Sequence, residues 1–177
     1  AYECGNYSAN ADPALAAFTP GTGDALRTTV THGTAASPAG IAFKSTRETT
    51  VVDGHGNQVL TETYVYTGTG YARIAWTVQA FDPHGRVTDV WKSDGTHVQG
   101  AWACCGLESA TTADGIAYTY TYDSLHRVST VTKSGYNGTA DIVTTYAYDA
   151  AGRKRSETVA AGGLSLSLIH ISEPTRL

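Results

Sequence analysis

Three groups of residues in this sequence have types and spacings that could support chemistry. The pattern Asp-x-His-Gly occurs at residues 53–56 and again at 82–85, and an Asp and a His so close together could form an acid–base or metal-binding pair. The adjacent residues Cys104 and Cys105 could form a redox site. Exposed aromatic residues could form a sugar-binding platform, and the candidates are the Tyr-rich segments together with Trp76, Trp91 and Trp102.

Each group also has a structural interpretation, which we favour. Asp and Gly are common turn residues, so the Asp-x-His-Gly segments predict turns. Adjacent cysteines bridge only through a strained ring and no Cys-x-x-Cys is present, so the pair predicts buried small side chains or a tight turn ending at Gly106. The tryptophans lie in alternating strand patterns and predict packing in the core or between repeats.

No phosphate-binding Gly-rich loop, Gly-x-Ser-x-Gly elbow or His-Glu-x-x-His motif occurs in the sequence. The cysteines are Cys4, Cys104 and Cys105, too few and too unevenly spaced for a disulfide framework or a four-thiolate zinc site. We therefore predict no enzymatic activity, no catalytic residue, no cofactor and no metal. An enzyme remains the alternative if a cleft collects Asp82, His84 or Cys104 with perturbed ionisation.

The elements that would position these residues come from an internal repeat. Two segments, at 120–127 and 146–153, share the frame Tyr-x-Tyr-Asp-x-x-Gly/His-Arg. A third segment at 81–86 keeps an aromatic residue, the Asp, the Gly and the Arg. A fourth at 52–57 has Val in place of the aromatic residue and Asn in place of the Arg. The intervals between the four Asp residues are irregular, and the long one from Asp82 to Asp123 predicts an inserted hairpin. The motif residues are Phe81, Asp82, Gly85, Arg86, Tyr120, Tyr122, Asp123, Arg127, Tyr146, Tyr148, Asp149, Gly152 and Arg153.

The repeat unit is predicted to be a strand, a turn and a strand. Threonines alternate with the tyrosines at 118–122 and 145–148, which puts the aromatic rings on one face that we expect to be buried. The Asp is predicted to accept a bond from the backbone N–H two residues on, and Gly to supply a left-handed position that His126 fills in one copy. The Arg can pair with the turn Asp or lie over a neighbouring ring.

Composition agrees with strands and turns: the chain has 11 Tyr, 19 Gly and many Thr and Val. Its net charge of −4 without a basic cluster argues against nucleic-acid partners. No apolar stretch is long enough to span a membrane, and no export signal is visible. The chain begins with Ala1 and has no Met, so we expect an internal fragment of a longer protein.

From about residue 52 to 159 these motifs resemble the YD repeats of RHS proteins, teneurins and the cocoon-forming components of bacterial insecticidal toxin complexes. The resemblance implies an all-β fold in which successive antiparallel hairpins form a curved or spiralling sheet, part of a hollow shell. In many members that shell encloses a toxic C-terminal domain of the same polypeptide. The implied function is a non-enzymatic structural segment of a large bacterial protein, and the alternative is a surface adhesion or carbohydrate-binding module.

The predicted organisation has three parts: degenerate repeats or a linker at 1–50, the repeat array at 51–163 and an artefactual tail at 164–177. Within the tail, residues 166–176 resemble a translated sequencing adapter, and the alternative is a genuine edge strand at 166–171. The predicted partners are the rest of the parent polypeptide and a glycan or other surface ligand. The expected location is secreted or on the cell surface, and open strand edges predict self-association of the isolated chain.

Overall fold

The computed structural model describes residues 1–33 and 45–169, and the fold in these ranges is built from antiparallel strands. Between strands, a single turn of 3₁₀-helix, η1 (Pro13–Leu15), begins at Asp12, whose side chain accepts a bond from the Ala14 N–H. The predicted all-β fold of antiparallel hairpins is confirmed. In this part of the chain no helix is long and apolar enough to cross a membrane.

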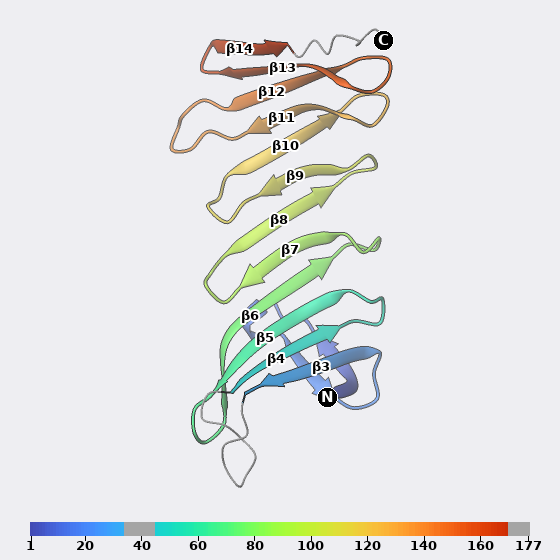
Figure 1. Cartoon of the computed structure of the whole chain (residues 1–177), viewed down its shortest axis with the longest axis vertical. Helices are drawn as coiled ribbons and strands as arrows, with labels where there is room; N and C mark the ends of the chain where they lie inside the picture. The colour runs from blue at the N-terminus through green and yellow to red at the C-terminus, as the bar shows by residue number, and fades with distance from the viewer. Residues whose placement is uncertain (34–44, 170–177) are drawn as a thin grey trace, which may run out of the picture. The chain divides into compact units, whose positions relative to one another are not determined.

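The chain divides into two compact units, Ala1–Val98 and Gln99–Leu177, and the division falls inside strand β8 (His97–Trp102). In each unit the strands lie side by side mostly in chain order (Figure 1). The boundary that we predicted after residue 50 falls within β4 (Thr46–Val52), so it does not coincide with the division into compact units.

The N-terminal unit contains a meander of consecutive antiparallel pairs from β3 to β7, and β1 pairs with both β2 and β3. The other strands of the unit are β1 (Tyr2–Ser8), β2 (Ala17–Pro20), β3 (Ala25–His32), β5 (Gln58–Tyr66), β6 (Tyr71–Phe81) and β7 (Val87–Lys92).

A small hydrophobic core lies in the N-terminal unit because residues before β3 pack against the sheet (violet ribbon in Figure 1). Ala16 comes from this segment and Ala25 is the first residue of β3, and both cluster with side chains of β4, β5 and β6. Tyr7, Phe18, Trp76, Phe81 and Trp91 surround the cluster, which consists of Ala16, Ala25, Val51, Val59, Leu60 and Val78. Residues expected to be a linker or degenerate repeat thus contribute to the core.

The C-terminal unit is a second meander, in which each strand pairs with the next from β8 to β14. The order is that of an open sheet, with β14 paired on one side among the described strands. Its further strands are β9 (Leu107–Thr111), β10 (Ala117–Tyr122), β11 (Val128–Lys133), β12 (Ile142–Tyr148), β13 (Lys154–Ala161) and β14 (Leu164–Ile169).

The predicted alternation of tyrosine and threonine is present on β10 and β12. The five tyrosines at 118, 120, 122, 146 and 148 are half-buried, while Thr119, Thr121 and Thr145 are exposed. The tyrosine face is therefore the less exposed one, but it is not buried as we expected. No described residue of this unit is fully buried.

The predicted tail contains β14, whose described residues pair with β13. Leu164, Leu166 and Leu168 are 80%, 66% and 60% exposed. Residues 170–177, which include the rest of the adapter-like segment, lie outside the described part of the chain. The artefactual origin of this tail stays a prediction, because a strand can form whatever the origin of its sequence.

Candidate functional site

The four Asp turns share one backbone geometry. In each, the Asp N–H donates to the carbonyl four residues on at 2.9 Å, and the N–H three residues on donates back to the Asp carbonyl at 3.0 Å. The copy at 52–57 makes the same two bonds although it lacks the aromatic and the Arg. The residue before each Asp lies at a β-bulge, as register shifts show at Val52, Phe81, Tyr122 and Tyr148.

The Asp carboxylate closes each turn with three bonds. In the copy at 123–127, Asp123 Oδ1 accepts the N–H of Leu125 at 2.9 Å and that of Arg127 at 3.0 Å, while Oδ2 accepts Arg127 Nε at 2.8 Å. The turns at Asp82 and Asp149 repeat this pattern with their own Arg, and Asn57 Nδ2 takes the place of the guanidinium at Asp53. The predicted Asp acceptor and Arg–Asp pair are thus confirmed.

The left-handed position is occupied as predicted. The φ angles are 90° at Gly56, 76° at Gly85, 60° at His126 and 80° at Gly152. His is one of the few other residues that adopt such angles without large strain. This explains why the copy with His126 keeps the same turn as the glycine copies.

Arg127 also contacts the next copy of the repeat. Its guanidinium carbon lies 4.5 Å from the centre of the Tyr148 ring, and Nη1 approaches the Asp149 carbonyl at 3.5 Å. The Tyr148 hydroxyl donates to the Val128 carbonyl at 2.8 Å. Arg127 and Tyr148 therefore join successive turns at this edge of the sheet. As predicted, Arg127 pairs with the turn Asp and also lies over a neighbouring aromatic ring.

These contacts lower the pKa of the turn carboxyls. At Asp123 the Arg127 guanidinium and then the Arg127 N–H hold the pKa below its usual value, and at Asp149 the N–H and then the guanidinium of Arg153 do the same. At Asp53 and Asp82 burial favours the neutral acid, but bonds from Asn57 and Arg86, respectively, outweigh it and lower the pKa. All four carboxyls are thus stabilised as anions that bind turn donors.

Two further turns have the same backbone bonds and were missed in the sequence. Lys92 and Thr112 occupy the Asp position, and their N–H groups donate to Thr96 and Ile116 carbonyls at 2.9 Å. The only sequence signal is an Asp-Gly dipeptide at 94–95 and at 114–115. These two turns and the turn at 103–106 connect the strands between Asp82 and Asp123. The long interval between the two Asp residues therefore contains the extra hairpin that its length predicted.

The Asp-x-His-Gly pairs serve the turns. It is the backbone N–H of His55 that donates to Asp53, and that of His84 that donates to Asp82, each at 2.9 Å. Within residues 1–33 and 45–169, no group of three or more His, Cys, Asp and Glu is arranged to hold a metal. The backbone bonds of His55 and His84 confirm the turn interpretation of both pairs.

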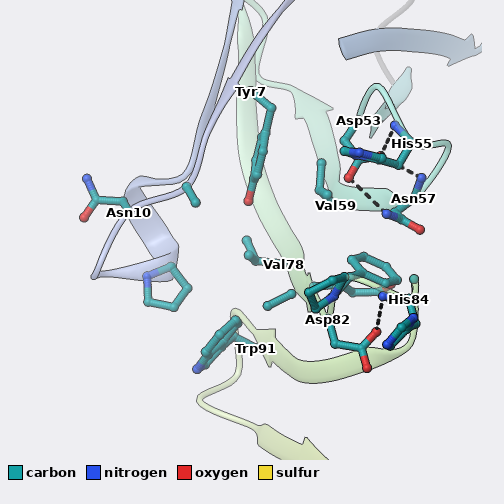
Figure 2. Close-up of a pocket in the computed structure, with 17 residues that line it drawn as sticks. Tyr7, Asn10, Asp53, His55, Asn57, Val59, Val78, Asp82, His84 and Trp91 are labelled. Atoms are coloured by element: carbon teal, nitrogen blue, oxygen red, sulfur yellow. Dashed lines mark hydrogen bonds between the residues drawn. The ribbon is translucent and has the colours of Figure 1, made fainter. Parts of the chain in front are cut away.

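A cavity of about 650 Å³ opens between these two turns in the N-terminal unit (Figure 2). It collects both Asp-x-His-Gly segments but not Cys104. Its apolar wall includes Val59, Val78, Phe81 and Trp91, and its polar groups include Asn10, Asn57, Gln79 and both histidines. The cavity combines aromatic and polar groups, as ligand pockets do.

Tyr7 lines this cavity with a hydroxyl group that lacks a hydrogen bond. Its hydroxyl is buried without a hydrogen-bond partner, and burial raises its pKa above the usual value. Figure 2 shows the ring extending along the cavity with the hydroxyl toward Val78. A buried hydroxyl that lacks a partner is a costly feature, and a bound polar group would relieve it.

The structure confirms the packing interpretation for two of the three tryptophans and the turn interpretation for the cysteine pair. Trp76 and Trp91 pack against the core, as predicted, whereas Trp102 is 37% exposed. Cys104 is exposed and Cys105 is half-buried, so their expected burial as small hydrophobic side chains is wrong for Cys104. The alternative of a tight turn ending at Gly106 is correct, because the Ala103 N–H donates to the Gly106 carbonyl at 2.9 Å.

No family model matches the sequence, and no curated protein matches it. The likeness to YD repeats therefore rests on the motif residues alone and stays a prediction.

Proposed function

We propose that this chain is a non-enzymatic structural segment of a large bacterial RHS-type protein, forming part of a β-shell that encloses or displays a C-terminal toxin domain. The observation that carries this proposal is the repetition of one turn, closed by an Asp carboxylate in four copies. A carboxylate bound by two N–H groups and a neighbouring side chain holds a hairpin end rigidly. Such a group is engaged in structure and is not available for proton transfer.

Successive turns that contact each other through Arg127 and Tyr148 suit a wall that grows by adding hairpins. Each repeat buries its aromatic face only in part, so further repeats or enclosed protein would cover the remainder. These features support a segment whose partners are the neighbouring repeats and the enclosed domain. Secretion or display at the surface follows from this role and belongs to the same proposal.

The test is to extend the source gene beyond both ends of this chain and to examine the parent protein. We expect further Tyr-x-Tyr-Asp-x-x-Gly-Arg hairpins followed by an unrelated C-terminal domain. In the purified parent, that domain should resist a protease until the shell is denatured. A membrane anchor directly after the repeats, or a C-terminal domain that is cleaved at once in the native parent, would contradict the enclosing role.

The cavity between the two Asp-x-His-Gly turns supports a second candidate, a carbohydrate-binding surface module. Trp91 and Phe81 offer ring faces, and Asn10, Asn57 and Gln79 offer amides for hydroxyl groups. This site differs from the platform of tryptophans and Tyr-rich segments that was the alternative interpretation of the sequence, because Trp76 and Trp102 do not line it.

A glycan array followed by titration of tryptophan fluorescence tests this candidate. The affinity for a bound glycan should fall in Trp91→Phe, because the smaller ring offers less surface for the sugar. The matched variant Trp102→Phe should bind the glycan as the wild type does, because Trp102 lies outside the cavity. Absence of any hit on the array, or an equal loss in both variants, would rule out this binding site.

A further inference from the structure

The turn between β8 and β9 takes the place of an Asp turn in the C-terminal unit. The Tyr122 hydroxyl donates to the Leu107 carbonyl at 2.8 Å, just as that of Tyr148 donates to Val128. Leu107 directly follows the turn at 103–106, and Val128 directly follows the turn at 123–127. The same tyrosine contact therefore holds both turns.

Register and bulge agree with this equivalence. Trp102 pairs with Leu107 across a register shift, and Tyr122 pairs with Val128 across the same kind of shift. The turn at 103–106 is one residue shorter, with Ala103 where the Asp would be and Gly106 in place of the Arg. A side chain at Gly106 would meet the Tyr122 ring, since a Cβ there would lie 2.8 Å from Cζ.

The shorter turn lacks the carboxylate and guanidinium that close the other copies. At its tip it carries Cys104 and Cys105, both free thiols, with their sulfur atoms 2.7 Å apart. Cys104 is exposed and Cys105 half-buried, so small reagents can reach the pair. The hydrogen bond with Cys104 raises the pKa of the Cys105 thiol. Cys104 is the more exposed of the two, so it is the thiol that a reagent reaches first.

We propose that Cys104 and Cys105 are a redox-active vicinal dithiol, which a low-molecular-weight disulfide oxidises to an intramolecular disulfide at the tip of this turn, through the strained ring that adjacent cysteines form. The inference does not depend on the shell function, because it concerns a modification of this chain's own thiols.

The reaction is a thiol–disulfide exchange in two steps. The Cys104 thiolate attacks one sulfur of the reagent R–S–S–R, the S–S bond breaks, and one RS⁻ leaves with a mixed disulfide on Cys104. The Cys105 thiolate then attacks the Cys104 sulfur, and the second RS⁻ leaves. The protein loses two electrons, the reagent gains them, and the two thiol protons end on the two released RSH molecules.

The test uses the full chain and oxidised glutathione, followed by alkylation of remaining thiols and intact-mass measurement. The reduced chain has three alkylatable cysteines, and after oxidation we expect Cys104 and Cys105 to be blocked without added glutathione, whereas the exposed Cys4 carries at most one glutathione. The peptide containing Cys104 and Cys105 should lose two hydrogens and regain them with dithiothreitol. A Cys4→Ser chain should go from two alkylatable thiols to none.

Matched variants separate the two steps. Cys105→Ser should stop at a stable glutathione adduct on Cys104, because the resolving thiol is missing. In the Cys104→Ser chain, the glutathione adduct on Cys105 should form more slowly than the adduct on Cys104 forms in the Cys105→Ser chain. The proposal is overturned if the wild-type chain retains glutathione on either cysteine of the pair at equilibrium, links to a second chain through them, or oxidises only at Cys4.

Discussion

Val51 and Leu60 of the N-terminal unit are 0% and 1% exposed, whereas no described residue of the C-terminal unit is comparably buried. The two units contain the same turns and the same antiparallel pairing. They differ in the segment before β3, which packs on the sheet of the N-terminal unit and completes a core. Repeated hairpins alone thus give half-buried tyrosines, and a second layer is needed to exclude water.

This comparison implies that the units are stabilised by different interactions. Apolar burial contributes most in the N-terminal unit, since the free energy gained grows with the apolar area removed from water. The C-terminal unit depends more on turn carboxylates and on the tyrosine hydroxyls that bind carbonyls of the preceding hairpin. Substitutions in the two units should therefore differ in size and in their dependence on pH.

The largest expected effect is that of Leu60→Ala in the N-terminal core. Removing this fully enclosed side chain should lower the free energy of unfolding by about 2–5 kcal/mol, measured by urea denaturation at low protein concentration. Leu125→Ala is the matched control, because Leu125 is 68% exposed at a turn of the C-terminal unit, and it should change stability by less than about 0.5 kcal/mol. Equal effects would refute a core confined to the N-terminal unit.

Gly106→Ala should have the next largest effect. The added Cβ would lie 2.8 Å from Cζ of Tyr122 and would push the ring away from the turn. Overpacking of this kind costs about 1–3 kcal/mol, which urea denaturation would detect. Gly21→Ala is the control and should cost less, because Gly21 has a similar φ of 152° but no atom within 4 Å of an added Cβ. A Gly106→Ala chain as stable as wild type would show that Tyr122 does not hold this turn.

An intermediate effect is expected from acid. The pKa values of Asp123 and Asp149 are lower in the folded chain than the usual value of about 3.9, so their stabilisation is complete above about pH 4. It is lost as the pH falls through the lowered pKa, because protonation then favours the unfolded chain. Denaturation midpoints at pH 6 and pH 3 should differ less in Asp123→Asn than in wild type.

The exposed Glu108 provides the control for this pH dependence. Glu108→Gln removes a carboxylate from β9 of the same unit, outside the turns, and should keep the wild-type difference between the two midpoints. If Asp123→Asn behaves like Glu108→Gln, the turn carboxylates do not stabilise the C-terminal unit.

The sequence allowed the hairpins and their turns to be predicted because those features are local. Asp123 and Arg127 are only four residues apart, and the alternation of Tyr and Thr follows directly from strand geometry. Even the divergent copy at Asp53 could be placed, because it keeps the Asp and the Gly of the motif. In the structure Asn57 takes over the role of the Arg as donor to the carboxylate. The turns that begin at Lys92 and Thr112 were missed because the residue that marks the motif is absent.

The core and the cavity could not be predicted, because they depend on contacts between residues far apart in the chain. Ala16 joins a cluster with Val78, and Tyr7 lines a cavity with Trp91, without any periodic signal linking these positions. The equivalence of the cysteine turn with the Asp turns was likewise hidden, since of the motif it keeps only an aromatic residue, Trp102, before the turn. It is visible in the contact of Tyr122 with Leu107 and in the register shift at Trp102.

The smallest predicted effect is that of Tyr148→Phe, which removes one hydroxyl and keeps the ring under Arg127. The loss of the 2.8 Å bond to the Val128 carbonyl should lower the free energy of unfolding by about 0.5–1.5 kcal/mol. Tyr136→Phe is the control, because Tyr136 is 64% exposed, and it should have no measurable effect. If both variants match wild type, the ring stacking on Arg127 alone holds successive turns together, and the hydroxyl bond between hairpins contributes nothing to the C-terminal unit.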